Sequence, residues 1–172
     1  GKAGGEQFLT AETTKTGVRS VNAIYIYDWK NLGAPLELIR ELAHEYGHAT
    51  LPPIGGFKKP EEWANGHLGE RLYLLWMLDN VQRGNIDAGE LVGTEPAAIS
   101  DYLKKNVSPY VFRIMDRGPR VDLLKQTTVE AMNEYLGLVM AAESFLPHSA
   151  FARSLVLPPT QNAMGYYQAL RD

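Results

Sequence analysis

The spacing of apolar residues changes along the chain. Each change predicts the start of a new strand, helix or loop. Val21–Tyr27 is β-branched and aromatic and ends at Asp28, which predicts a strand. From Pro35, the run 36–50 consists of helix-forming residues with apolar side chains at helical spacing, which predicts a helix. Pro52 and Pro53 then end this helix and begin a loop. Residues 1–20 are polar and rich in Gly, Thr and Lys, and we expect them to form an extended arm.

The rest of the chain is predicted to be helical. A second helix begins between Pro60 and Gly66, runs to about Arg83 and ends at Gly84. Its middle is apolar nearly all round, so we expect it to be buried. Further helices are expected over 95–105, 108–115, 121–145, 149–155 and 160–170. No repeat or linker interrupts this pattern, and the expected fold is α+β, mostly α, in a single domain of residues 1–172.

Composition and charge exclude several classes of protein. The 172 residues are 45% hydrophobic and 22% charged, which is typical of one folded globular domain and excludes a wholly disordered chain. With 17 Lys+Arg against 20 Asp+Glu, the net charge of -3 gives no basic surface, and we expect no nucleic-acid partner. The longest apolar runs fall short of the roughly 20 residues that a membrane-spanning helix needs.

The chain contains no cysteine. This excludes disulfides, thiolate nucleophiles and zinc sites built on cysteine, so any transition-metal site must use His and carboxylates. The chain also opens without an initiator Met, which is compatible with removal of a signal peptide or a flanking domain. The absence of cysteine is compatible with an exported bacterial protein, and the compartment stays open.

The one specific chemical signal is His44-Glu45-Tyr46-Gly47-His48, an H-E-x-x-H pattern within a predicted helix. Residues four apart share one face of a helix, so His44 and His48 can bind one zinc ion while Glu45 lies beside its water. Zinc lowers the pKa of that water to about 7, and a carboxylate can pass its proton to a leaving amine. Gly47 is unfavourable inside a helix, which predicts that another segment or a substrate approaches closely there.

His44, Glu45 and His48, on a helix that follows a strand, resemble the active-site motif of the zincin metallopeptidases. The resemblance implies a zincin-like fold, with a small β-sheet or edge strand before the active-site helix and a helical C-terminal part. It also implies zinc-dependent hydrolysis of peptide bonds in a peptide or protein substrate. In that superfamily the preceding strand often pairs with an extended substrate, a role that Val21–Tyr27 could take by strand addition. An equally good interpretation is that this strand only backs the helix.

Catalytic zinc takes three protein ligands, so a third must follow the motif. The metzincin pattern is excluded because Leu51 and Ile54 stand where it needs Gly and His. The gluzincin branch takes a Glu from a following helix, and Glu70, at the start of the apolar helix, is the favoured residue. If Glu70 is the ligand, His67 would line the cleft. The alternatives that stay open for the third ligand are His67, Glu61 and Glu62.

The resemblance further implies a Tyr or His that stabilises the oxyanion of the tetrahedral intermediate. Candidates for this role are His148, Tyr110, and the pair Tyr166 and Tyr167, none of which has a motif around it. An alternative function is a noncatalytic, metal-stabilised binding module of a larger protein, such as a surface protein. A third hypothesis is a helical interaction domain in which the H-E-x-x-H motif occurs by chance.

Overall fold

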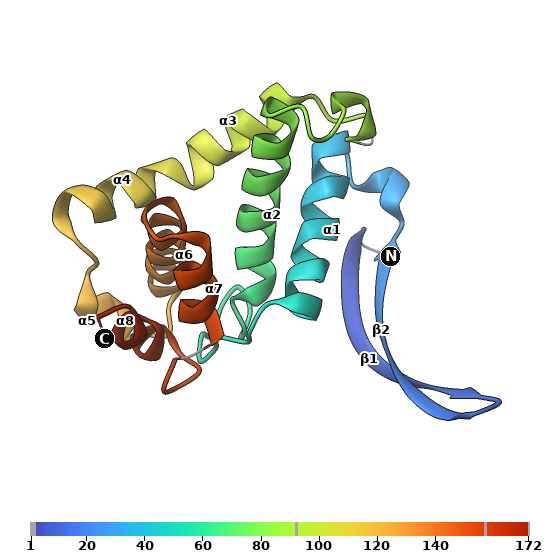
Figure 1. Ribbon diagram of the computed structural model, residues 1–172, viewed down its shortest axis with the longest axis horizontal. Coiled ribbons are helices and arrows are strands. Elements are labelled where there is room, and N and C mark those ends of the chain that lie inside the picture. The colour runs from blue at the N-terminus through green and yellow to red at the C-terminus, as the bar shows by residue number, and fades with distance from the viewer. Residues whose placement is uncertain (1–2, 92, 157, 172) are drawn as a thin grey trace.

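The computed structural model describes residues 3–91, 93–156 and 158–171, and it is mostly helical with one small sheet (Figure 1). Strands β1 (Gly4–Thr14) and β2 (Gly17–Tyr27) form a two-stranded antiparallel sheet in which Gly4 lies opposite Tyr27. The helices follow: α1 (Pro35–Thr50), α2 (Asn65–Gln82), α3 (Pro96–Asn106), α4 (Ser108–Arg117), α5 (Val121–Leu124), α6 (Val129–Phe145), α7 (His148–Val156) and α8 (Ala163–Arg171). Short 3-10 turns span Trp29–Asn31 and Ala88–Glu90.

The β-hairpin lies beside α1 near its open end and extends away from the helices toward its turn (Figure 1). The amide of Asn22 in β2 donates to the carbonyl of Ala49 in α1 at 3.2 Å. Nearer the turn, Leu9 and Val18 are both 71% exposed, so the apolar side chains in that part of the hairpin do not pack against the helices. The predicted strand over Val21–Tyr27 is confirmed as part of β2.

Residues 4–14 form the first strand of the hairpin, where the sequence suggested only an extended arm. The polar, Thr-rich sequence of β1 has no apolar face that would mark it as a strand. Its partner β2 supplies the backbone hydrogen bonds along the whole length, from Gly4 to Thr14. Pairing with β2 therefore forms a strand that the pattern of β1 alone does not predict.

Helices α1 and α2 pack side by side and antiparallel (Figure 1), and they touch at two glycines. A Cβ on Gly47 would lie 2.9 Å from the Cα of Gly69 and closer still to the carbonyl of Asn65. A Cβ on Gly69 would lie 2.7 Å from the carbonyl oxygen of Ala43. No side chain fits between the two backbones, which confirms the prediction that another segment approaches Gly47 closely.

The hydrophobic core lies mainly among α2, α4, α6, α7 and α8, and α6 is its most buried helix. The core also contains one fully buried carboxylate, Glu134 of α6. It accepts hydrogen bonds from the guanidinium of Arg113 at 2.5 Å and from the amide and guanidinium of Arg120. These contacts hold the end of α4 and the following turn against α6.

The single long helix expected over 121–145 is wrong, because the chain turns between α5 and α6. The side chain of Thr128 accepts a hydrogen bond from the amide of Ala131 at 3.2 Å and caps a new helix. Thr127 meanwhile uses its carbonyl to accept from the amide of Lys58. The other predicted helices are present, with ends that differ by a few residues. Within the described parts of the chain, no helix has the length and apolar character that a bilayer crossing requires.

Candidate metal centre

Five side chains that can bind a metal gather where α1, the following loop and the start of α2 meet. His44 and His48 of α1 form one group with Glu61 of the loop, and His44 also forms a second group with His67 and Glu70 of α2. Within each group, one possible ligand atom from every residue lies within 4.8 Å of the others. The two helices and the loop therefore converge on His44.

The first group has the spacing of a zinc site. The Nε2 atoms of His44 and His48 lie 3.2 Å apart. Glu61 places Oε1 at 2.8 Å from the His44 Nε2 and Oε2 at 3.3 Å from the His48 Nε2. Two ligands at about 2.0–2.1 Å from a tetrahedral zinc ion are about 3.3 Å from each other. The three side chains are thus close enough together to hold one small ion.

The other ring nitrogen of each histidine faces an oxygen acceptor. His48 Nδ1 lies 3.0 Å from the side-chain oxygen of Asn65. His44 Nδ1 and His67 Nδ1 lie 3.9 Å and 3.7 Å from the same oxygen of Glu70, Oε2. A histidine that binds a metal through one nitrogen normally donates the other N–H to such an acceptor, which fixes the ring. The Nε2 atoms of His44 and His48 are therefore the ones left for a metal.

Glu70 is buried, and both of its oxygens are in use. Its Oε1 accepts from the guanidinium of Arg40 and from the hydroxyl of Tyr102, each at 2.5 Å. Burial alone would raise the pKa of Glu70, but contacts with His44, His67 and Tyr102 and the charge of Arg40 outweigh it and hold that pKa well below its ordinary value. Glu70 is accordingly a fixed, negatively charged acceptor beneath two imidazoles.

Without a metal, His44 and Glu61 form an ion pair. Burial alone would lower the pKa of His44, but its contacts with Glu61 and Glu70 raise that pKa to about 10. Burial would raise the pKa of Glu61, but its contacts with His44 and His48 reverse the effect and hold that pKa well below its ordinary range. His44 therefore carries a proton at neutral pH, and a metal ion must displace that proton.

Two observations show that the residues present fit a cation. First, Glu61 Oε2 and His67 Nε2 are buried without a hydrogen-bond partner, which is costly unless another group binds there. Second, Gly66 leaves room in front of the two imidazoles, because a Cβ there would lie 2.6 Å from the His44 Nε2 and closer still to the His48 Nε2. The absence of a side chain at Gly66 therefore leaves the two Nε2 atoms unobstructed on the side of α2.

Glu45 lies next to this group, buried between α1 and β1. Successive residues of a helix are about 100° apart, so Glu45 flanks the face that carries His44 and His48. A Cβ on Gly5 of β1 would lie 2.9 Å from Glu45 Oε1, which shows how closely the strand approaches this carboxyl group. Burial raises the pKa of Glu45, although the charges of His44 and His48 oppose the shift. A raised pKa suits a group that takes up and releases a proton near neutral pH.

The structure brings the predicted motif residues to one place but distributes the other candidates differently. Glu61, one of the alternatives for the third ligand, lies in the group with both motif histidines. Glu70, the favoured residue, and His67 share a group with His44 alone. Glu62 is exposed and belongs to neither group among the described residues.

The candidates for stabilising an oxyanion lie in other parts of the fold. Tyr110 packs against Gly137, in the contact of α4 with α6. Tyr166 is fully buried in the core, and Tyr167 packs against its edge. The ring of His148 lies 6.1 Å from that of Trp76. None of the four belongs to either metal-binding group of the described residues.

Sequence reasoning missed Asn65 and Gly66, which stand directly before His67. Asn65 holds the His48 ring, and Gly66 leaves the space in front of both imidazoles. The only available signal was an Asn-Gly pair at the start of a predicted helix, which is a common turn sequence and carries no metal signature. Their roles depend on the way α2 packs on α1, which the local sequence does not reveal.

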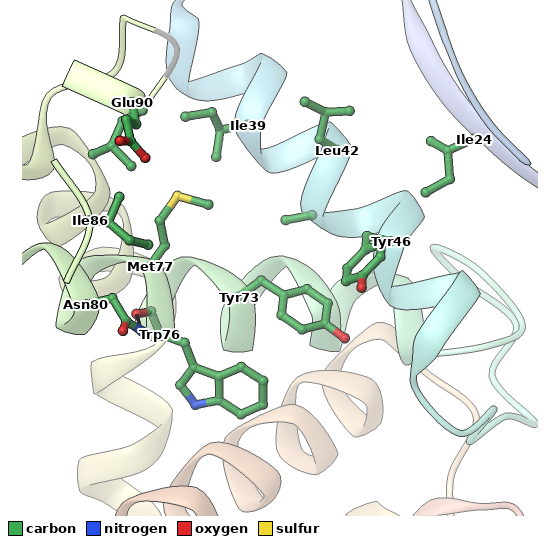
Figure 2. A pocket seen from close by; sticks show the side chains of 12 residues that line it. Ile24, Ile39, Leu42, Tyr46, Tyr73, Trp76, Met77, Asn80, Ile86 and Glu90 are labelled. Atoms are coloured by element: carbon green, nitrogen blue, oxygen red, sulfur yellow. Dashed lines mark hydrogen bonds between the residues drawn. The ribbon is translucent and has the colours of Figure 1, made fainter. Parts of the chain in front are cut away.

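A separate apolar pocket of about 660 Å³ lies between α1 and α2 (Figure 2). Figure 2 shows its lining, which includes Ile39, Leu42 and Tyr46 of α1, Tyr73, Trp76 and Met77 of α2, and Ile24 of β2. Tyr46 follows His44 by two residues, about 200° around the helix, so the pocket faces away from the histidines. The metal cluster and this pocket are therefore on different sides of α1.

Comparisons of this chain with protein-family models, with curated proteins and with solved structures found no match.

Proposed function

We propose that this protein is a zinc-dependent hydrolase of peptide bonds, with His44 and His48 as two of the metal ligands and Glu45 as the general base. The observation that carries the proposal is the pair of Nε2 atoms, 3.2 Å apart and facing a carboxylate, beside a buried glutamate. A bound zinc ion would lower the pKa of a water molecule and polarise the substrate carbonyl. The finer likeness to the zincin fold, with the β1–β2 hairpin as the only sheet among the described residues, belongs to the same proposal.

Glu45 carries the proton transfers in this reaction. Its carboxylate takes a proton from the attacking water and delivers it to the leaving amine. Burial favours the protonated form, while the neighbouring imidazoles favour the charged one, so both forms are accessible during a turnover. The close packing of Gly5 against its side chain restricts the positions that the carboxyl group can take.

The substrate class follows from the free edge of β1. In the described residues the sheet contains only β1 and β2, so the outer edge of β1 has unpaired backbone groups. Gly5 of β1 touches Glu45, which makes β1 the strand next to the base, rather than the Val21–Tyr27 segment considered from the sequence. An extended peptide that adds to this edge would present its backbone to Glu45.

The test is hydrolysis by the zinc-loaded protein of a library of quenched fluorescent peptides. Glu45→Gln should keep one zinc per chain and lose at least about 100-fold in turnover, because general base catalysis contributes about 10²–10⁴-fold. Glu41→Gln is the matched control, since Glu41 lies one turn earlier beside Gly4 and should retain activity. Full activity in Glu45→Gln would show that the mechanism is wrong.

A noncatalytic metal-stabilised binding module is the second candidate function. The observation that favours it is the apolar pocket, which is large enough for a small molecule or an apolar side-chain cluster and lies away from the metal-binding residues. This alternative predicts one bound zinc per chain and no hydrolysis of any peptide in the library.

A further inference from the structure

The identity of the third metal ligand is decided by which side of the His44 ring the ion occupies. Glu61 faces the Nε2 atoms of both motif histidines, at 2.8 Å and 3.3 Å. Glu70 faces only the opposite nitrogen of His44, Nδ1, at 3.9 Å. We infer that Glu61 is the third ligand and that Glu70 is a positioning residue that holds the imidazoles. The inference rests on the proposed function, from which it takes His44 and His48 as ligands.

The contacts of Glu70 explain why it does not serve as the ligand. Arg40 and Tyr102 both donate to Oε1, and the Nδ1 atoms of His44 and His67 face Oε2. To reach an ion at the Nε2 atoms, this buried carboxylate would have to leave four partners and move around the His44 ring. Its present place is that of the outer carboxylate that fixes a metal-binding histidine.

Glu61 is held in position by contacts of its loop with distant parts of the chain. The amide of Ala64 donates to the carbonyl of Ile54 at 2.8 Å, which closes the loop on itself. The amide of Gly55 donates to the carbonyl of Gln161 at 3.0 Å, and the amide of Lys58 donates to Thr127 at 2.8 Å. The loop is thereby fixed to the segments that precede α6 and α8, and it presents Glu61 to the histidines from outside both helices.

One carboxylate oxygen of Glu61 makes no hydrogen bond, so it is available to bind a metal ion. Oε2 is buried and makes no hydrogen bond, although it lies 3.3 Å from the His48 Nε2. The side chain as a whole is 34% exposed, so an ion can reach it from solvent without unfolding of the loop. A zinc ion at this point would satisfy the free oxygen of Glu61 and both Nε2 atoms together.

The test compares Glu61→Gln, Glu70→Gln and the matched control Glu62→Gln in the full chain. Zinc stoichiometry and dissociation constants are measured by chelator competition, and the Co²⁺-substituted proteins are compared by visible absorption. Glu70→Gln should lower the zinc affinity about 10- to 100-fold and leave the Co²⁺ spectrum unchanged. The reason is that this substitution changes only the acceptor that holds the imidazole rings. Glu61→Gln should lower the zinc affinity by more than this and change the Co²⁺ spectrum. Glu61→His should recover zinc binding, because imidazole is also a zinc ligand. Glu62→Gln should match the unsubstituted protein.

The outcomes separate this inference from the proposed function. A Glu61→Gln protein with unchanged zinc affinity and spectrum would overturn the ligand assignment, while peptide hydrolysis dependent on Glu45 would still stand. The same holds if Glu70→Gln alone changes the Co²⁺ spectrum. Absence of zinc from the unsubstituted protein would overturn both. Circular dichroism of each variant verifies that a loss of zinc does not come from unfolding.

Discussion

Gly66→Ala is expected to weaken zinc binding strongly, because the new methyl group would take the space in front of the two imidazoles. The added Cβ would lie 2.6 Å from His44 Nε2 and 2.8 Å from His48 Cε1, and closer still to His48 Nε2. Ordinary contacts begin near 3.4 Å, so the His44 ring would have to move by about 0.8 Å. Metal sites tolerate about 0.2 Å in their ligand distances, and a shift of this size exceeds that tolerance severalfold.

The surrounding contacts resist such a shift. Asn65 faces the His48 ring nitrogen on its far side, and Glu70 does the same for His44. We expect the crowding to cost about 1–3 kcal/mol of folding stability. Zinc affinity should fall at least about 100-fold, which corresponds to about 2.8 kcal/mol.

Chelator competition measures the affinity of Gly66→Ala, and thermal unfolding with and without zinc provides a second readout. Zinc should raise the melting temperature of the unsubstituted protein and leave that of the variant unchanged. Gly4→Ala serves as the control, because its Cβ would meet Glu41 at an ordinary 3.6 Å. If Gly66→Ala bound one zinc per chain with unchanged affinity, the placement of the ion at the Nε2 atoms would be refuted.

Three further predictions concern the helix crossing, the proton on His44 and the buried carboxylate of α6. Gly47→Ala should lower the free energy of unfolding by about 1–3 kcal/mol in urea denaturation, since its Cβ would press on the Gly69 backbone; an unchanged midpoint would contradict this. Zinc affinity should rise nearly tenfold per pH unit from pH 6.5 to 8.5, because His44, with a pKa raised to about 10, must lose its proton; a flat profile would argue against the ion pair. In the metal-free protein, the stability that the charged His44 contributes is complete below about pH 6.5 and is lost as the pH rises through about 10. Glu134→Ala should destabilise the fold by about 3 kcal/mol, because Arg113 and Arg120 lose their common partner, and a loss below 1 kcal/mol would mean that solvent replaces it.

The sequence predicted α1 and the shared face of its two histidines because the information there is local. Helical spacing alone places His44 and His48 on one face, and the unfavourable Gly47 indicated a close neighbour before any partner was known. The boundary between α5 and α6 was missed although Thr128 is a typical capping residue, because residues 125–128 are polar but contain no Gly or Pro that would mark a turn. Local patterns therefore predicted that this segment is helical but did not predict the break between its two helices.

Glu61, the third ligand that we propose, was only one of the alternatives at the level of sequence, for a different reason. Glu61 stands in a segment without periodicity, and its position depends on hydrogen bonds from that loop to Gln161 and Thr127, far along the chain. Glu70 was favoured because a carboxylate at the head of an apolar helix needs a strong partner, and that reasoning holds. Its partners include Arg40 and Tyr102, which no spacing rule connects with it.

The contact between Gly47 and Gly69 bears on which ions the protein can accept. Because main chain meets main chain there, no change of rotamer can alter the gap between α1 and α2. The histidine pair on one helix and the backbone of Gly66 on the other are held at a set separation. Ca²⁺, with six to eight oxygen ligands at about 2.3–2.6 Å, would require this frame to expand, whereas zinc at about 2.0–2.1 Å would not. None of the three proposed ligands lies on α2, so the crossing limits the ion only through the space between the histidine pair and Gly66, and for the proposed site that space suits a small ion.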